Sequence, residues 1–303
     1  MHNNNFKTVT FVTSITPIMI TTKLNPEDKL PLTCSRTGTC CHGKTVWLNP
    51  WELALIAREK KISRSEFIDL YCDFGGIKLK FEGEKGWKEM KSCSQYIPNF
   101  GCSVHLGRPL ACRLYPLGRQ IQSEKVHYIH EGKEFPCLEG CPEVVNLPFM
   151  TVGEYIHDQS AGEFENSQDL HLELMQKLAD IAFELFLDTG LAQSGDTETL
   201  QEWTKLGDLT PDELNLKIGK DWLKALVLPE ITEIDNAISF TSKHTELLLT
   251  KAQEQYGSLT TFNEVRDASV QIMGVALQLS RSFGADPKSL STHWVETAIS
   301  HLG

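Results

Sequence analysis

The sequence predicts an α+β protein that is mostly helical, with a small cysteine-rich domain containing short strands followed by an acidic helical region. All nine cysteines lie between Cys34 and Cys141, and the rest of the 303-residue chain contains none. Residues 1–150 carry 19 Lys and Arg and 15 Asp and Glu, whereas residues 151–303 carry 10 and 25. Apolar residues at helical spacing fill this acidic part.

The break in charge coincides with the end of the cysteine-rich stretch, so we predict a boundary near residue 150. Residues 1–150 would form the cysteine-cluster domain with an N-terminal extended arm, and residues 151–303 an acidic helical domain. The chain is long enough for one large or two ordinary domains. The acidic domain disfavours nucleic acid as a partner.

The cysteine-rich part has turn-rich segments between short elements. The arm is predicted over residues 6–22, which are rich in Thr, Val, Ile and Phe. Glycines in residues 37–43 permit a turn that wraps several groups around one centre. Short strands or hairpins are predicted at residues 45–48, 76–91, 92–96, 101–104 and 126–130.

Capping signals mark the helix starts in both parts. In the cysteine-rich part they predict helices over residues 50–60, 63–71 and 151–159, beginning at Asn49-Pro50, Ser63 and Thr151. In the acidic part, periodicity and caps predict helices over residues 170–190, 210–228, 265–283 and 287–302, with a weakly amphipathic segment over residues 231–256.

The cysteines fall into groups that suit thiolate ligation of a metal. The groups are Cys34-x5-Cys40-Cys41, Cys93-x8-Cys102-x9-Cys112 and Cys137-x3-Cys141. These eight thiolates suit two four-thiolate sites, or one such site with a disulfide or spare ligands. Cys72 stands apart from the groups and is predicted to be a small core residue.

Spacing favours an iron–sulfur cluster, such as a 4Fe–4S cluster, over zinc. Zinc ribbons and knuckles usually present Cys-x2-Cys pairs, and the sequence contains none. The side chains of adjacent Cys40 and Cys41 tend to diverge, so they could serve two centres. Zinc stays open as the alternative, and a secreted disulfide framework is a weaker one.

Several other side chains in the motifs could take part in a site. Arg108 and Arg113 flank Cys112 and could compensate the charge of a multi-thiolate centre, bind an anionic substrate, or serve as structural hydrogen-bond donors. His42 and His105 could replace a thiolate or be polar loop residues. Glu52 and Tyr115 could be acid–base groups, although a helix cap and a core position explain them; no catalytic residue is assigned.

No run of residues approaches the roughly 20 apolar residues of a membrane span. Residues 8–22 are apolar but rich in Thr and interrupted by Pro17, and no basic segment directly precedes an unbroken apolar core, so we do not expect a signal peptide. We therefore expect a cytoplasmic location without membrane contact. In that reducing compartment clustered cysteines more often bind metal than form disulfides.

The string Cys102-x5-Arg108-Pro109-x2-Cys112-Arg113-x-Tyr115-Pro116, with Cys40-Cys41 upstream, resembles the YkgJ-type cysteine-cluster family, described as a zinc- or iron-chelating domain. The resemblance covers roughly residues 34–145. It implies that the family's cysteines correspond to Cys34, Cys40, Cys41, Cys93, Cys102 and Cys112, with Cys137 and Cys141 in a less constant tail. The gap between Cys34 and Cys40 is wider than in compact members, which makes Cys34 the least certain ligand of its group.

Three functions are compatible with these features. The first is a metal or iron–sulfur protein whose centre is structural or redox-active. The second is a cluster-dependent enzyme that modifies a protein or peptide, since flagellin lysine methylases resemble the same family; the sequence shows no glycine-rich fingerprint for a methyl donor. The third is a metal-stabilised module in which the acidic helices bind a protein or peptide partner.

Overall fold

The computed structural model describes residues 21–32, 34, 38–122, 125–131 and 149–302. Most of the predicted arm over residues 6–22 lies outside them. The strands are β1 (Thr21–Leu24), β2 (Lys29–Leu30), β3 (Cys72–Asp73), β4 (Lys78–Leu79), β5 (Tyr96–Ile97), β6 (Gly101–Cys102), β7 (Leu117–Gln122), β8 (Lys125–Glu131) and β9 (Met150–Thr151). The short 3-10 helices are η1 (Thr39–Cys41), η2 (Phe74–Gly76), η3 (Trp87–Glu89) and η5 (Ala192–Ser194).

The α-helices carry most of the structure. They are α1 (Pro50–Lys60), α2 (Arg64–Tyr71), α3 (Leu110–Leu114), α5 (Val152–Asp158), α6 (Gly162–Leu187), α7 (Glu198–Asp208), α8 (Pro211–Ile218), α9 (Lys220–Val227), α10 (Ala237–Tyr256), α11 (Phe262–Arg281) and α12 (Pro287–His301). The predicted class, mostly helical α+β with short strands, is confirmed.

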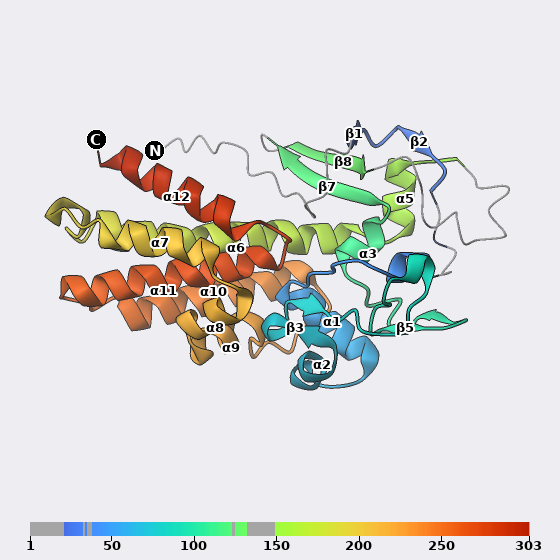
Figure 1. Ribbon diagram of the computed structural model, residues 1–303, viewed down its shortest axis with the longest axis horizontal. Helices are drawn as coiled ribbons and strands as arrows, with labels where there is room; N and C mark the ends of the chain where they lie inside the picture. Colours follow the sequence, from blue (N-terminus) through green and yellow to red (C-terminus); the bar gives the residue numbers. More distant parts are fainter. Residues whose placement is uncertain (1–20, 33, 35–37, 123–124, 132–148, 303) are drawn as a thin grey trace.

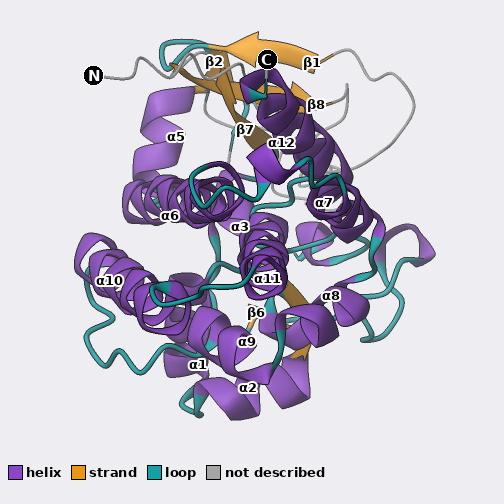
Figure 2. Cartoon of the chain, turned by 90° about the vertical axis from the view of Figure 1, so that its left-hand side faces the viewer, coloured by secondary structure: helices purple, strands orange, loops and turns teal. Residues whose placement is uncertain are grey.

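The long helices form a platform, and the cysteine-rich segments lie at one end of it. Helices α6, α10 and α11 run side by side, and α7 and α12 pack together next to them (Figure 1). Figure 2 looks nearly along these helices and shows the small sheet above α6. This platform is the acidic part that the periodicity predicted.

The sheet above α6 has the antiparallel order β1–β8–β7. Two polar contacts join it to α6. Arg119 on β7 donates two hydrogen bonds to the carboxylate of Asp169, at 2.7 and 2.8 Å. The Tyr128 hydroxyl on β8 donates to Glu165 at 2.7 Å. A bidentate arginine pair of this kind fixes orientation as well as distance.

The largest hydrophobic core includes side chains from both predicted domains. Leu53 and Ile56 of α1 and Phe67 of α2 belong to the same buried cluster as Leu174 of α6 and Ile272 of α11. Burying such side chains stabilises by roughly 1.5–3 kcal/mol each. The cysteine-rich segments therefore rest on the platform through apolar packing, and the boundary near residue 150 stays a prediction.

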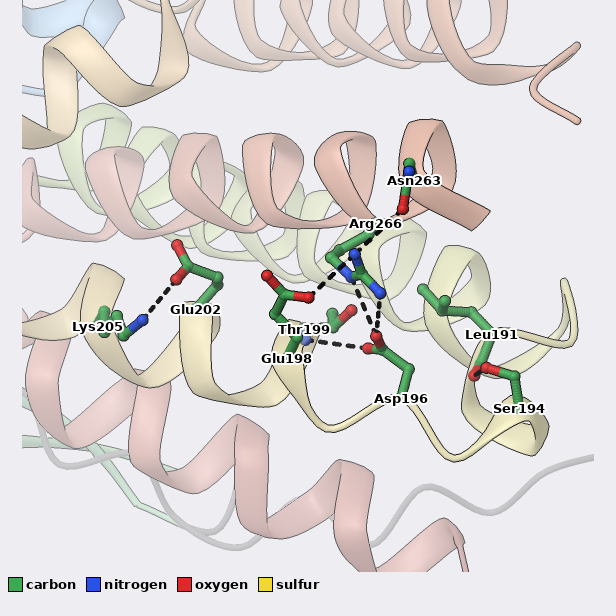
Figure 3. A network of polar contacts seen from close by, with 9 residues as sticks. All are labelled: Leu191, Ser194, Asp196, Glu198, Thr199, Glu202, Lys205, Asn263 and Arg266. Carbon is green, nitrogen blue, oxygen red and sulfur yellow. Dashed lines mark hydrogen bonds and ion pairs between the residues drawn. The ribbon is translucent and has the colours of Figure 1, made fainter. Parts of the chain in front are cut away.

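At the far end of the platform a buried carboxylate ties the η5–α7 loop to α11. Asp196 accepts hydrogen bonds from the Arg266 guanidinium, one of them 3.0 Å from Nε, and from the Thr199 N–H at 3.0 Å (Figure 3). Burial raises the pKa of Asp196, but the hydrogen bonds from Thr199 and Arg266 lower it by a larger amount, so the net shift is downward. The Asp196 carboxylate thus also supports the first turn of α7.

The predicted helix starts at Asn49, Thr151, Thr210 and Asp286 agree with the structure. The starts predicted at residues 170 and 265 are too late, since α6 begins at Gly162 and α11 begins at Phe262 after the capping box of Thr261. The structure has capping boxes at Asn49, Thr151 and Thr210, and Asp286 caps α12. The predicted continuous helix over residues 210–228 is wrong, because the chain turns at Gly219 (φ 87°) and forms α8 and α9 instead. That φ lies in a region that glycine adopts readily.

Two further predictions need correction. The segment over residues 231–256 becomes helical only at Ala237. The predicted hairpin over residues 76–91 is reduced to β4 pairing with β3 and a bridge between Lys85 and Lys91 around η3. Within the described residues, no helix is long and apolar enough to cross a membrane.

Candidate metal centre

Six of the eight predicted metal ligands lie within the described residues, and they come from several short elements and loops. Cys40 and Cys41 end η1, Cys102 lies on β6 and Cys112 on α3. Cys34 follows β2, and Cys93 lies in the loop before β5. Cys137 and Cys141 lie outside the described residues, so their predicted role is neither supported nor opposed.

Backbone hydrogen bonds bring the first two cysteine groups together. The Cys93 N–H donates to the Cys41 carbonyl oxygen at 2.7 Å, and His42 bridges to Ser92. The Tyr96 N–H donates to the Cys93 carbonyl at 2.9 Å, and Tyr96 pairs with Cys102 across the β5–β6 ladder. One continuous set of main-chain contacts therefore positions Cys41, Cys93 and Cys102.

A glycine makes the turn before Cys40 possible. Gly38 has φ 81°, and a Cβ atom there would lie 2.1 Å from Cε2 of the Tyr96 ring. Only glycine combines this left-handed backbone with such a close approach. The predicted wrapping turn over residues 37–43 is therefore present at Gly38, and the Tyr96 ring packs against it.

The six thiols are electrostatic neighbours. A hydrogen bond with Cys40, then burial, and then the charges of Cys40, Cys112 and Cys102 raise the pKa of Cys41 far above its usual range. Burial and then the charges of Cys93, Cys40 and Cys102 raise the pKa of Cys112.

The pKa values of Cys93 and Cys102 are raised as well. Burial raises the pKa of Cys93 to about 11, with contributions from Cys102 and Cys40. Burial also raises the pKa of Cys102, and the charges of Cys40 and Cys34 add to it. Several thiolates could not coexist here without a cation, because each would repel the others. A metal ion supplies that charge and binds the thiolates, so this donor set fits a thiolate-bound metal.

The described cysteines form no disulfide with one another, and their side chains do not form a ready-made shell around one ion. Among the described residues, no three His, Cys, Asp or Glu side chains are arranged to hold a single metal ion. The six described thiols of the predicted groups share one region of the molecule, and they outnumber the four ligands of one tetrahedral zinc ion.

Arg108 brings a buried positive charge to the Cys34 thiol. The arginine is 7% exposed, and its Nη1 atom donates to Cys34 Sγ at 3.4 Å. His105 Nε2 lies 3.9 Å from the same sulfur and also contacts Nη1. Nη2 donates to the Gln159 side chain. Arg108 thus occupies the position expected of a charge-compensating group, and His105 lies beside a predicted ligand.

Arg113 makes a different set of contacts. Its Nε donates to the Arg108 carbonyl at 2.9 Å and its Nη1 to the Gln159 carbonyl at 2.7 Å, while Nη2 donates to the Leu106 carbonyl. The guanidinium carbon lies 3.8 Å from the centre of the Phe164 ring. These contacts fix the loop between Leu106 and α3, so Arg113 positions both Arg108 and Cys112. Binding of a cofactor by Arg113 stays a prediction.

Glu52 connects α1 to the helix that carries Cys112. The carboxylate is buried, closes the capping box by accepting from the Asn49 N–H at 3.0 Å, and accepts from the Leu110 N–H at 2.6 Å. Burial raises the pKa of Glu52 to about 7, against the opposing effect of these two N–H groups and of Arg113. The sequence showed the capping role of Glu52, but not its bond to α3.

Replacing Glu52 with Gln is expected to destabilise the fold by about 1–3 kcal/mol, because the amide nitrogen would face a buried N–H of Asn49 or Leu110 and leave it without an acceptor. Chemical denaturation and metal content per chain measure the effect. Glu213→Gln is the matched control, since Glu213 has the same place in the exposed capping box of α8. We expect the control to cost no more than about 0.5 kcal/mol. Equal losses in the two variants would contradict the bridging role of Glu52.

Three other residues that the sequence singled out are Cys72, His42 and Tyr115. Cys72 is buried in the main core, and burial raises its pKa to about 12, consistent with the predicted core position. His42 Nδ1 donates to the Gly38 carbonyl at 2.9 Å and its ring meets Tyr96 edge-on, so it braces the turn. The third residue, Tyr115, has the Lys44 ammonium group over its ring, and Lys44 also lowers the pKa of Cys112 against the larger effect of burial.

Sequence analysis missed Gln159. Its side-chain oxygen accepts from Arg108 and its carbonyl from Arg113. It caps α5 at the C-terminal end. Residues from the acidic part therefore complete the surroundings of the cysteines. The sequence carries no local signal for this, because Gln159 is 46 residues or more from either arginine.

Thiols grouped from several loops beside a buried arginine suit a cysteine-rich, metal-chelating domain. Residues 33–132 match the family model CxxCxxCC, described as a "putative zinc- or iron-chelating domain". The predicted resemblance to a cysteine-cluster family is thereby confirmed for this segment, while the likeness to flagellin lysine methylases stays a prediction. No curated protein and no solved structure matches the chain.

The name of the family, read as a pattern, shows where this chain departs from it. With Cys34 as the first cysteine and Cys40-Cys41 as the closing pair, the second cysteine falls at Thr37. The wide gap after Cys34 is thus the place of one missing thiol. This leaves the first group with three thiols instead of four.

Proposed function

We propose that the thiolates of Cys40, Cys41, Cys93, Cys102 and Cys112, with Cys34 at the edge, hold an iron–sulfur cluster. The observation that supports the proposal is the number of thiols in one region. Six of them influence one another electrostatically, which is more than the four that one zinc ion takes. A cluster takes one thiolate at each of its iron atoms, and the sequence contains none of the Cys-x2-Cys pairs that are typical of zinc sites.

Such a cluster would supply one-electron transfer or hold the loops together. The role of this chain's residues is to provide and neutralise the negative charge. Arg108 donates to Cys34, and the burial of its guanidinium strengthens that electrostatic contact. Hydrogen bonds to the cysteine sulfurs tune the potential of such centres.

Metal and acid-labile sulfide per chain, with a visible spectrum, test this proposal on protein purified without oxygen. Iron, sulfide and broad absorption near about 400 nm are the expected result for a thiolate-bound cluster. Colourless protein with one or two zinc ions and no sulfide would overturn the cluster and retain a chelating domain. Protein with neither metal nor free thiols would overturn both.

Replacing Arg108 with Gln is expected to weaken metal retention about 10–100-fold, the usual cost of losing a group that contacts a ligand rather than the metal. Loss of metal to a chelator over time measures the change. Arg108→Lys should restore part of it, because the charge returns without the planar fork. Arg119→Gln is the control, since Arg119 is also a largely buried arginine but pairs with Asp169. Equal metal loss in both would contradict the role of Arg108.

A further inference from the structure

A second group of metal-ligating side chains lies in the helical platform and takes no part in the cysteine centre. His171 on α6 and His244 on α10 are both fully buried, and their ring centroids are 5.8 Å apart. Phe240 and Phe283 lie 6.4–6.5 Å from the His171 ring, centre to centre. The pair is therefore enclosed mainly by aromatic and helical packing.

The backbone fixes the tautomer of each ring. His171 Nδ1 lies 2.8 Å from the Ser167 carbonyl oxygen, and His244 Nε2 lies 3.1 Å from the Ala225 carbonyl oxygen. A carbonyl only accepts, so both of these nitrogens must carry the hydrogen. This leaves lone pairs on His171 Nε2 and His244 Nδ1, the two ring nitrogens that have no hydrogen-bond partner.

Two unpartnered lone pairs on neighbouring rings can donate to an electron-pair acceptor such as a metal ion. Metal-binding histidines characteristically donate their other N–H to a carbonyl or carboxylate, as both rings do here. Two imidazoles that share one ion at about 2.0 Å have centroids about 5 Å apart in a tetrahedral and about 6 Å apart in a linear arrangement. The observed separation lies within this range.

We propose that His171 and His244 bind one monovalent soft metal ion of the copper(I) type. No third described side chain joins them in a group suited to a metal ion, so the coordination preferred by zinc or magnesium is not provided. Copper(I) accepts two ligands. The charge of Arg64 acts on His244, and it opposes a divalent ion twice as strongly as a monovalent one.

Burial also keeps the rings in the form that binds metal. It lowers the pKa of His171 to about 4 and that of His244 to about 3, the latter with help from His171 and Arg64. Both rings are therefore neutral at physiological pH. Metal binding at this pair does not depend on the identity of the cysteine centre.

Silver(I), a diamagnetic probe for copper(I), tests the site in protein labelled with nitrogen-15 at histidine and loaded with its own metal. Silver is added stepwise past the nine equivalents that the cysteines could take, with circular dichroism at each step. One-bond coupling to silver is expected on His171 Nε2 and His244 Nδ1. His157, which is exposed on α5, should show none at the same step.

The proposed site would be overturned if the nitrogen signals of His171 and His244 stayed unchanged while silver binds the thiols. Unfolding of the protein before any coupling appears would also overturn it. An ordered water between the rings would leave these signals uncoupled and would count as the same result. His244→Gln should abolish the coupling at His171. If that variant does not fold, coupling in the unsubstituted protein still decides the question.

Discussion

Serine in place of Cys112 is expected to remove most of the bound metal and to destabilise the fold by several kcal/mol. Burial and neighbouring thiolates raise the pKa of Cys112, so its thiolate depends on a cation, and the metal in turn depends on its thiolate. Structural thiolate sites contribute about 10–16 kcal/mol of binding free energy that is also folding free energy. We expect Cys40, Cys41 and Cys102 to behave in the same way.

Metal per chain, soluble yield and the denaturation midpoint measure the effect. Cys72→Ala is the matched control, because Cys72 is also buried but packs in the main core. That variant should lose about 1 kcal/mol and keep its metal. Full metal retention after each of the four serine substitutions would rule out the assignment of these residues as ligands.

The sequence predicted helix starts well where a capping box was recognised in it, as at Asn49, Thr151 and Thr210. The capping side chains of Asn49 and Thr210 accept from the N–H three residues later, so the signal is contained in four consecutive residues. The prediction failed where a contact with a distant residue, or the backbone conformation of one residue, determined where a helix begins or ends. The break at Gly219 between α8 and α9 is one case. The short α3, with only five residues, is another, since Glu52 supports its first turn from outside.

The candidate centre was predictable in its thiols but not in its surroundings. Cysteine grouping alone singled out the six described thiols that we propose as ligands, because cysteine is rare and clusters for a chemical reason. Arg108 contacts Cys34, which is 74 positions away in the sequence, and Gln159, which is 51 positions away. No local spacing encodes such contacts, so the sequence could only leave the role of Arg108 open.

The histidine pair shows how an apolar pattern can hide a polar site. The apolar residues at 170–185 predicted the helix and part of its buried face, since Leu174 and Leu178 are buried but Leu170, Ile181 and Leu185 are only half-buried. In the structure that face includes Phe164, Ser167, His171, Leu174 and Leu178 on α6. The spacing of three and four residues places His171 within this stripe. A histidine at a core position of a helix is the signal that could have identified the site.

The titration of His171 and His244 is expected to make the protein acid-labile. Unfolded histidine has a pKa near 6.5, whereas burial lowers the pKa of His171 to about 4 and of His244 to about 3. The unfolded chain therefore binds protons more tightly than the fold does between these values. The contribution of this pair to stability is fully present above about pH 6.5 and is lost as the pH falls towards 4, by up to roughly 3 kcal/mol per pH unit for two protons. Glu52, whose pKa is raised to about 7 in the fold, opposes this slope by up to about one proton down to its unfolded pKa of about 4.3.

Denaturation at a series of pH values between 7 and 4 measures this slope. His171→Gln should reduce the slope by up to half, because one proton fewer is taken up on unfolding. His157→Gln, which changes an exposed histidine on α5, should leave it unchanged. The histidines are far from the cysteine groups in sequence and lie in the platform, so metal loss in acid can be followed separately by the visible spectrum. An unchanged slope in His171→Gln would mean that acid lability arises elsewhere, most directly from protonation of the thiolates that hold the metal.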